Sequence, residues 1–380
     1  MTEDAAGEWG DRHPPIEDWD EFALAADRLD MPEVIEAADP GDMLRQVASG
    51  AAQVRTALRA CAETDLSGFV ADGRPRAVVV AGMGGSGTAG DILGAVSGTG
   101  GPVQVVTVRV GRLPGWVGAA DVVIAVSCSG TSAETLALAT EAARRGCRLA
   151  CVGAEGSALH RIAEQARAPF IGVEQAGTVL PRQALWALTI PLLVIAERLG
   201  VTRVGADVFE QVARRLEEVS HQCRPASESF VNPGKSLALD LAGVLPVIWG
   251  TSLLSGVAAA RFACQLNENA KYPAIAGVLP EAMHNQIGVF DGPFAGDTPQ
   301  FPMRLVLLTD SSARELAVIA ELANQRGLAV SELAMEGEHP LERLAATVQL
   351  ADYASVYLGI ASGIDPGQAD AARDLSAHIE

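Results

Sequence analysis

The amino-acid sequence predicts an α/β protein of two domains, each built around a doubly wound parallel sheet. Short runs of continuous apolar, β-branched residues alternate with helical patterns, which is typical of parallel strands covered by helices on both faces. The alternation restarts after a charged stretch near the middle of the chain. The length of 380 residues also exceeds what one hydrophobic core usually organises.

An N-terminal segment, residues 1–65, precedes the two sheet domains. Residues 1–40 are acidic and contain Pro14 and Pro15, and we interpret them as mobile or as an arm in a dimer. From Gly41 to Thr64 the apolar spacing predicts an amphipathic helix. The segment is therefore expected to be a helical lead-in to the first sheet.

The first sheet domain is predicted over residues 66–200. Its strands are expected at 77–82, 103–110, 122–127, 148–154 and 169–174. The apolar segment QALWALTIPLLVIAERLG predicts a buried helix that closes the domain.

The second sheet domain is predicted over residues 201–380. Strands are expected at 244–250, 304–310 and 328–335, followed by a long helix from about Pro340. The segments AVVVAGMGGSGTAGDILGAV and VLPVIWGTSLLSGVAAARFA both have the pattern strand, loop of small and hydroxyl residues, helix. This similarity hints at an internal duplication but is too degenerate to prove one.

Composition and charge exclude several classes of partner. The net charge of −19 and the pI near 4.7 repel nucleic acid and acidic lipid. Six cysteines without a CxxC pair indicate reduced thiols in a reducing compartment. The N-terminus has no apolar signal core, and no run reaches the ~20 apolar residues that a membrane span needs. We therefore expect a soluble cytoplasmic protein without nucleic-acid or membrane partners.

The segment VVIAVSCSGTSAET at 122–135 places four hydroxyl side chains between a predicted strand and a predicted helix. In open parallel sheets, ligands bind at this point, where the unpaired N–H groups of the helix favour an anion. The hydroxyls therefore predict a phosphate site. The alternative is that Ser132 only caps the helix and its neighbours solvate a turn. The hydroxyl residues are Ser127, Ser129, Thr131 and Ser132.

The segment GMGGSG at 82–87 matches GxGxxG after a strand, so an NADP-dependent oxidoreductase is a candidate. The acidic residue expected about 20 residues further on is absent, and Arg109 and Arg112 are found there instead. A P-loop is excluded because Thr88 stands where lysine is required. A sugar site explains the loop better than either alternative, because its glycines let backbone amides approach a sugar and Ser86 offers a hydroxyl.

Three motifs together resemble the sugar isomerase (SIS) domain: GMGGSGTAGD, AVSCSGTSAET about 40 residues later, and LPRQAL at 180–185. In the second half, QLNENAKYP at 265–273 and LPEAMHNQIG at 279–288 are similar to the paired catalytic segments of the bifunctional phosphoglucose/phosphomannose isomerase family. The resemblance runs from about residue 40 to the C-terminus. It implies two flavodoxin-like SIS domains in one subunit.

The resemblance also implies roles for single residues. Glu268 is the base that moves a proton between C2 and C1, and His284 helps to open the sugar ring, reaching across the interface of a homodimer. The sugar side is lined by Gly84, Gly85, Ser86 and Arg182. The phosphate is held by Ser127, Ser129, Ser132 and the backbone around Thr131. Neither a metal ion nor another cofactor is expected, because positioned polar groups can stabilise an enediol.

One departure from the family concerns its C-terminal lysine, which assists proton transfer at the ring. Alignment of residues 363–380 places Ala369 at a family threonine and Ser376 at this lysine. The chain has two lysines, Lys235 and Lys271, and neither fills the position. Arg373 lies one helical turn away, but arginine does not shuttle protons.

The resemblance thus implies isomerisation of glucose 6-phosphate, mannose 6-phosphate or both to fructose 6-phosphate. The alternative is a phosphosugar-binding protein of the same fold with weak or lost catalysis. The choice of hexose depends on the shape of the pocket, which no spacing in the sequence encodes.

Overall fold

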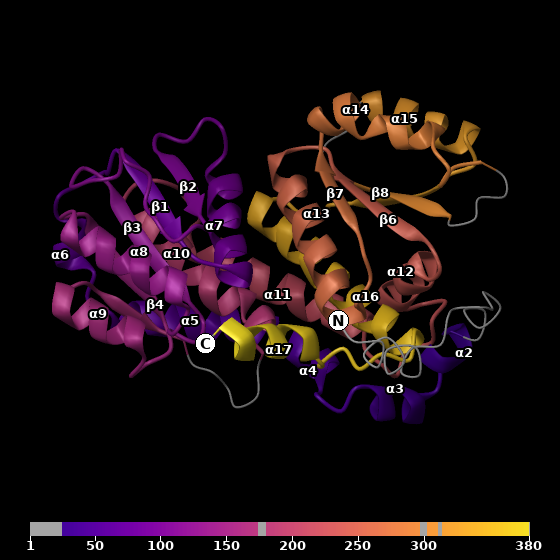
Figure 1. Cartoon of the computed structure of the whole chain (residues 1–380), viewed down its shortest axis with the longest axis horizontal. Coiled ribbons are helices and arrows are strands. Elements are labelled where there is room, and N and C mark those ends of the chain that lie inside the picture. Colours follow the sequence, from indigo (N-terminus) through magenta and orange to yellow (C-terminus); the bar gives the residue numbers. More distant parts are fainter. Residues whose placement is uncertain (1–24, 174–179, 297–301, 311–313, 380) are drawn as a thin grey trace.

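Two helix-covered parallel sheets lie side by side in the structure (Figure 1). The computed structural model describes residues 25–173, 180–296, 302–310 and 314–379. The predicted fold class, an α/β protein with two doubly wound parallel sheets, is confirmed.

The first sheet has five parallel strands in the order β2-β1-β3-β4-β5, which is the flavodoxin-like order. Val78 and Val80 of β1 lie in one core cluster with residues of α5, α7 and α10, whereas Val79 and Ala81 lie in another with residues of α8 and α9. Both faces are buried, which explains why the strands read as continuous apolar runs. The elements up to the end of this domain are α2 (Ala25–Leu29), α3 (Pro32–Ala38), α4 (Met43–Ala48), α5 (Gly50–Glu63), α6 (Ser67–Val70), β1 (Ala77–Ala81), α7 (Gly84–Ser97), β2 (Gln104–Val108), β3 (Val122–Ser127), α8 (Ala133–Arg144), β4 (Arg148–Gly153), α9 (Ala158–Ala166), β5 (Phe170–Gly172), η2 (Pro181–Gln183) and α10 (Leu185–Arg198).

The second sheet has four parallel strands in the order β7-β6-β8-β9. Ile248 of β6 faces α12, α13 and α16, whereas Val247 and Trp249 face α14 and α15. Its order repeats the first four strands of the first sheet, which agrees with the hint of duplication in the sequence. The elements are α11 (Ala206–Gln222), α12 (Pro233–Leu241), β6 (Leu245–Gly250), α13 (Leu253–Gln265), η3 (Leu266–Ala270), β7 (Ile275–Val278), α14 (Glu281–Asn285), η4 (Ile287–Asp291), β8 (Met303–Thr309), α15 (Arg314–Gln325), β9 (Ala329–Ala334), α16 (Pro340–Ala361) and α17 (Asp370–Ile379).

One apolar core continues from the first domain into the second. It joins Val80 and Trp186 of the first domain to Ile248 and Leu358 of the second, through the packing of α5, α10, α11 and α16. Among the described residues, α16 is the one helix long and apolar enough to cross a membrane. However, 89% of its most apolar window is buried inside the protein, as in a core helix. Because the core is shared, the domain boundaries at residues 65 and 200 stay predictions.

Two features were not predicted from the sequence. The first is the pair of helices α2 and α3: α2 packs on α16, and Asp30 accepts hydrogen bonds of 2.7 Å from the N–H and the hydroxyl of Ser229. Residues 25–40 therefore include helices that pack on the protein within one chain. The interpretation of the segment as mobile or as an arm in a dimer stays a prediction, and residues 1–24 lie outside the described residues. Strand β7 was not predicted, because its sequence IAGV is short and half of it is alanine and glycine, which have low strand propensity.

Candidate active site

The glycine-rich loop follows β1 at the carboxyl edge of the first sheet. Gly84 has a positive φ of 50°, a conformation that glycine adopts without strain. Ser86 is buried in the first turn of α7. A Cβ atom at Gly85 would lie 3.6 Å from the carbonyl oxygen of Pro181, so this loop lies against η2. The loop thus connects Gly84, Gly85 and Ser86 to the segment that carries Arg182.

The hydroxyl-rich loop follows β3, the neighbour of β1 in the sheet. Ser127 is buried, and its hydroxyl lies 3.1 Å from both the hydroxyl of Ser132 and the N–H of Gly130, which donates to it. The hydroxyls of Ser129 and Thr131 are exposed and lie 2.9 Å apart. Thus the four predicted hydroxyl residues form two adjacent pairs at the N-terminus of α8.

The hydrogen bonds of Ser132 argue against the alternative in which this residue only caps α8. Ser132 stands at the N-cap position, yet within the described residues its hydroxyl makes no hydrogen bond to the first N–H groups of the helix. Gly130 has a φ of 67°, and a Cβ atom there would lie 2.1 Å from the Ser157 hydroxyl, so the turn requires glycine. The loop therefore presents hydroxyls and uncapped helix N–H groups together, which is the chemistry of an anion site.

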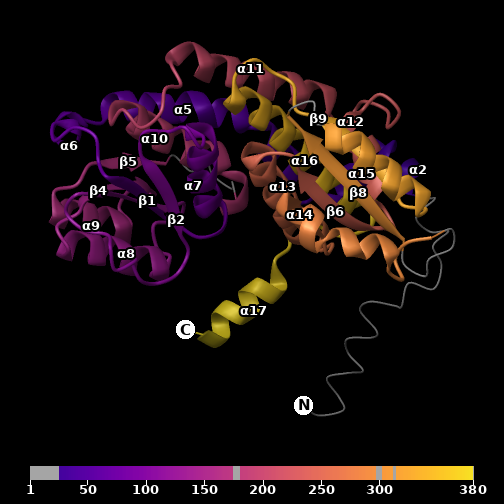
Figure 2. The ribbon, with the colours of Figure 1, turned by 90° about the horizontal axis from the view of Figure 1, so that it is seen from above.

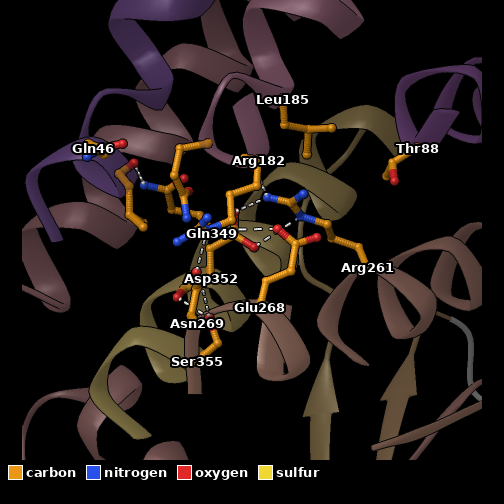
Figure 3. A network of polar contacts seen from close by, with 12 residues as sticks. Gln46, Thr88, Arg182, Leu185, Arg261, Glu268, Asn269, Gln349, Asp352 and Ser355 are labelled. Carbon is orange, nitrogen blue, oxygen red and sulfur yellow. Dashed lines mark hydrogen bonds and ion pairs between the residues drawn. The ribbon is translucent and has the colours of Figure 1, made fainter. Parts of the chain in front are cut away.

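Arg182 and Glu268 come together between the two domains (Figure 3). Arg182 Nε lies 3.8 Å from Glu268 Oε2 and donates a 3.0 Å hydrogen bond to Asn269 Oδ1. The Arg182 side chain is 11% exposed, whereas that of Glu268 is 45% exposed. Burial lowers the pKa of Arg182, and the nearby Glu268 carboxylate opposes this effect. The site therefore pairs a partly buried cation with a carboxylate that solvent or a ligand can reach.

A π-helical turn, η3, sets the direction of Glu268. It continues α13 without a break, and such turns occur frequently at functional sites. Asn269 is fully buried and donates to Ser355 Oγ at 2.9 Å, while Glu268 remains half-exposed. Lys271 closes the turn with a φ of 57°, and its ammonium donates to the carbonyl of Glu268 at 2.8 Å.

The Lys271 ammonium is held by main-chain carbonyls in this arrangement. Its ammonium also donates to the carbonyl oxygens of Asn269 and Asp365, at 3.4 Å and 3.3 Å. Burial lowers its pKa, and the neighbouring Arg182 lowers it further. The lysine of the NENAK motif therefore binds carbonyls of the turn and of the C-terminal segment.

His284 lies elsewhere in the chain. It is exposed on α14, whose Ala282 packs on the face of the second sheet opposite to α13. The structure of one chain therefore does not bring His284 to Glu268. Its predicted role depends on a second copy of the protein and stays a prediction.

The C-terminal segment touches the site just before α17 begins. Arg182 Nη2 donates to the carbonyl oxygens of Pro366 and Gly367 at 2.7 Å and 3.3 Å. Figure 2 shows α17, which contains Ser376, projecting away from the body of the molecule. Hence the start of α17 is anchored beside Arg182, although the helix itself does not cover the site in this chain.

Comparison with known proteins adds to this geometry. Residues 230–379 match the bacterial phospho-glucose isomerase C-terminal SIS domain. The SIS match includes Glu268, His284 and α17, and it confirms the resemblance drawn from the sequence motifs.

Relatives extend the similarity beyond this SIS domain. A bifunctional phosphoglucose/phosphomannose isomerase from Caldicellulosiruptor bescii is 29% identical over 297 residues, which cover 76% of this chain and 85% of that protein. The corresponding protein of Aquifex aeolicus is 27% identical over 261 residues, covering 67% and 74%. A hypothetical protein from Thermus thermophilus has a solved structure with a TM-score of 0.65 at 16% identity, covering 98% and 96%. The last similarity concerns the fold alone.

The sequence motifs missed three residues that the structure places around the site. Arg261 and Asp352 form a buried ion pair next to Arg182, and Ser355 binds Asn269. Asp352 and Ser355 lie in the long apolar helix α16, where a polar side chain in a buried stripe was the only local signal.

Proposed function

We propose that the protein interconverts glucose 6-phosphate, mannose 6-phosphate or both with fructose 6-phosphate. The observation that carries this proposal is the half-exposed Glu268 carboxylate 3.8 Å from the partly buried Arg182 guanidinium, in a chain similar to enzymes named for this reaction. Aldose–ketose isomerisation needs a positioned base beside a group that stabilises negative charge, and this pair meets both needs.

The substrate phosphate binds at the hydroxyl-rich loop. Four hydroxyls and the N-terminal N–H groups of α8 supply hydrogen-bond donors there. Local donors are required because the net charge of −19 repels an anion at long range. The glycine-rich loop, which follows the neighbouring strand β1, lies along the sugar.

Glu268 transfers the proton. Its carboxylate takes the proton from C2 of the open-chain aldose, and the electrons of the C–H bond form the C1–C2 double bond of the enediol while O1 gains a proton. The protonated Glu268 then gives its proton to C1, which takes the electrons of the C1–C2 double bond, while the hydroxyl at C2 loses its proton and becomes the carbonyl of the ketose. Arg182 stabilises the negative charge that develops on the oxygen atoms in the transition state. This base catalysis contributes ~10²–10⁴-fold to the rate.

Ring opening requires a further acid–base group, and His284 of a second copy supplies it. This assignment makes a homodimer the active form, with each site completed by the other subunit. It is supported by the position of His284 on the exposed helix α14, where it is accessible to a neighbouring chain. We further propose that the protein acts in the cytoplasm.

A phosphosugar-binding protein without efficient catalysis is the second candidate, favoured by Ser376 in place of the family lysine. A coupled assay with glucose 6-phosphate and with mannose 6-phosphate distinguishes the two candidates. Turnover with either substrate, unchanged after treatment with EDTA, supports the isomerase and its independence of metal. Binding of fructose 6-phosphate without turnover of any of the three sugars contradicts it.

A further inference from the structure

Arg261 makes three hydrogen bonds at the site, and one of them reaches the first domain. Its guanidinium donates to Asp352 Oδ1 at 3.3 Å and to Asp352 Oδ2 at 2.9 Å. Arg261 Nη2, which makes the 2.9 Å bond to Asp352, also donates to the main-chain carbonyl of Arg182 at 2.8 Å. The side chains of Arg261 and Asp352 are 3% and 8% exposed. Arg261 thus holds the backbone of Arg182 from α13, while Asp352 orients Arg261 from α16.

The side chain of Arg182 is held by the same turn of α16 through a second route. Arg182 Nε donates to Asn269 at 3.0 Å, Asn269 donates to Ser355 Oγ at 2.9 Å, and Ser355 Oγ donates to the carbonyl of Asp352 at 2.7 Å. Figure 3 shows Asn269, Asp352 and Ser355 grouped beside Arg182. Both the backbone and the side chain of Arg182 are therefore fixed relative to Asp352.

A buried ion pair is a weak device for stability, because desolvation of the two charges offsets their attraction. Apolar residues of similar volume would fill the same space at no cost in stability. The third hydrogen bond of Arg261 crosses the domain boundary to the carbonyl of Arg182. Apolar side chains at these two positions could not make this bond. A planar guanidinium can make all three bonds at once, whereas a lysine ammonium lacks the rigid fork.

From this geometry we infer that Arg261 and Asp352 are positioning residues for the isomerase reaction, holding Arg182 in place beside Glu268. The inference rests on the proposed function. Neither residue touches the substrate; each acts through Arg182. Arg182 belongs to the first domain and Glu268 to the second, so the Arg261–Asp352 pair holds Arg182 across the domain boundary.

The test is a double substitution, Arg261→Met/Asp352→Leu, which removes both buried charges and retains apolar volume. We expect kcat with fructose 6-phosphate to fall about 10²-fold, because a small misplacement of a site group costs that much. The KM should remain close to that of the wild type, since the phosphate loop is untouched. Arg261→Lys should show an intermediate kcat and serves as the test if the double variant does not fold.

A matched control is available in the first domain. Arg76 and Asp121 form an ion pair with a fully buried carboxylate at the amino ends of β1 and β3. Arg76→Met/Asp121→Leu should leave kcat and KM unchanged. If the wild type turns over and both Arg261 variants keep its kcat, the positioning role is wrong. If the wild type binds fructose 6-phosphate without turnover, the proposed function fails and the positioning role with it.

Discussion

Glu268 and Asn269 are neighbours in the sequence, yet their side chains do opposite things. Asn269 is buried and binds Arg182 and Ser355, whereas Glu268 remains accessible at the domain boundary. Adjacent side chains of a helical turn point in different directions, and the π-helical turn η3 carries both residues. A single residue can thus act as a base while the next one fixes its surroundings.

At the residue scale, Glu268→Gln should lower kcat by ~10²-fold or more, because glutamine keeps the size of the side chain but cannot accept the proton. Binding of fructose 6-phosphate should be unchanged. The measurements are turnover and exchange of the C2 proton with solvent. Glu164→Gln, at an exposed position of α9, is the control and should have no effect. Exchange at the wild-type rate in Glu268→Gln would contradict the role of base.

Ser127 and Ser129 allow a second test, directed at binding. A ligand at a hundredfold excess over its Kd stabilises the folded state by about 2.7 kcal/mol. Fructose 6-phosphate should therefore raise the Tm of the wild type, free fructose should not, and Ser127→Ala/Ser129→Ala should lose the shift. Ser97→Ala, which removes a hydroxyl bonded to the carbonyl of Leu93, is the matched control. A full shift in the double variant would refute the phosphate site.

At the scale of elements, α17 is the part whose position matters most for catalysis. Its N-terminal lead, residues 365–367, is bound by Arg182 and Lys271, while the helix projects outward (Figure 2). A side chain on α17 can reach a site only if the helix packs over it, in this copy or in another one.

Ser376→Lys should raise kcat with glucose 6-phosphate, by up to the ~10²-fold that one acid–base group contributes. The reason is that ring opening needs one group to take a proton and another to give one. The kcat with glucose 6-phosphate is compared between the wild type, Ser376→Lys and Ala371→Lys. The last variant adds a lysine at an exposed position of the same helix and should have no effect. Equal values in all three would show that another group opens the ring.

At the scale of the whole molecule, the two domains share one apolar core. This core fixes the position of Glu268 in the second domain relative to the loops of the first domain. The other requirement is assembly, because His284 lies on the opposite face of the second sheet from α13. One chain carries all the predicted groups without bringing them together.

Assembly can be tested by complementation. Glu268→Gln and His284→Ala should each be nearly inactive on cyclic substrates. If each site takes Glu268 from one subunit and His284 from the other, a mixture of the two variants forms dimers with one intact site. Unfolding and refolding the variants together should therefore restore part of the wild-type turnover. Turnover that stays at the level of the separate variants would place both residues in sites made by one chain.

The stability of the folded protein at acid pH depends on the ionisation of the Asp121 carboxyl group, which is fully buried. Burial alone would raise the pKa of Asp121, but hydrogen bonds from Arg76 and from the N–H of Gly118 outweigh this effect and leave the pKa lowered. A carboxyl with a lowered pKa contributes stability above its unfolded value of ~3.9, and this contribution is lost as the pH falls through the folded value. Asp121→Asn should therefore destabilise the protein at pH 7 and reduce the loss of stability below about pH 4. Urea unfolding across this pH range measures both effects, and parallel curves for the two proteins would contradict the assignment.

Local sequence was sufficient to predict the strands of the two parallel sheets except β7, and the loops after β1 and β3. These features follow from strand and helix patterns and from loop residues within a few positions of each other, so local preference specifies them. The motif that carries Glu268 was found through its resemblance to a known family. The partners of Arg182, in contrast, are set by long-range packing. Arg261 and Asp352 are 91 residues apart, and Arg261 reaches the carbonyl of Arg182 across 79 residues. The same packing places His284 on the far face of the second sheet. Contacts of this kind depend on which helix faces pack together, and that choice is made by burial of the whole apolar core rather than by any short segment.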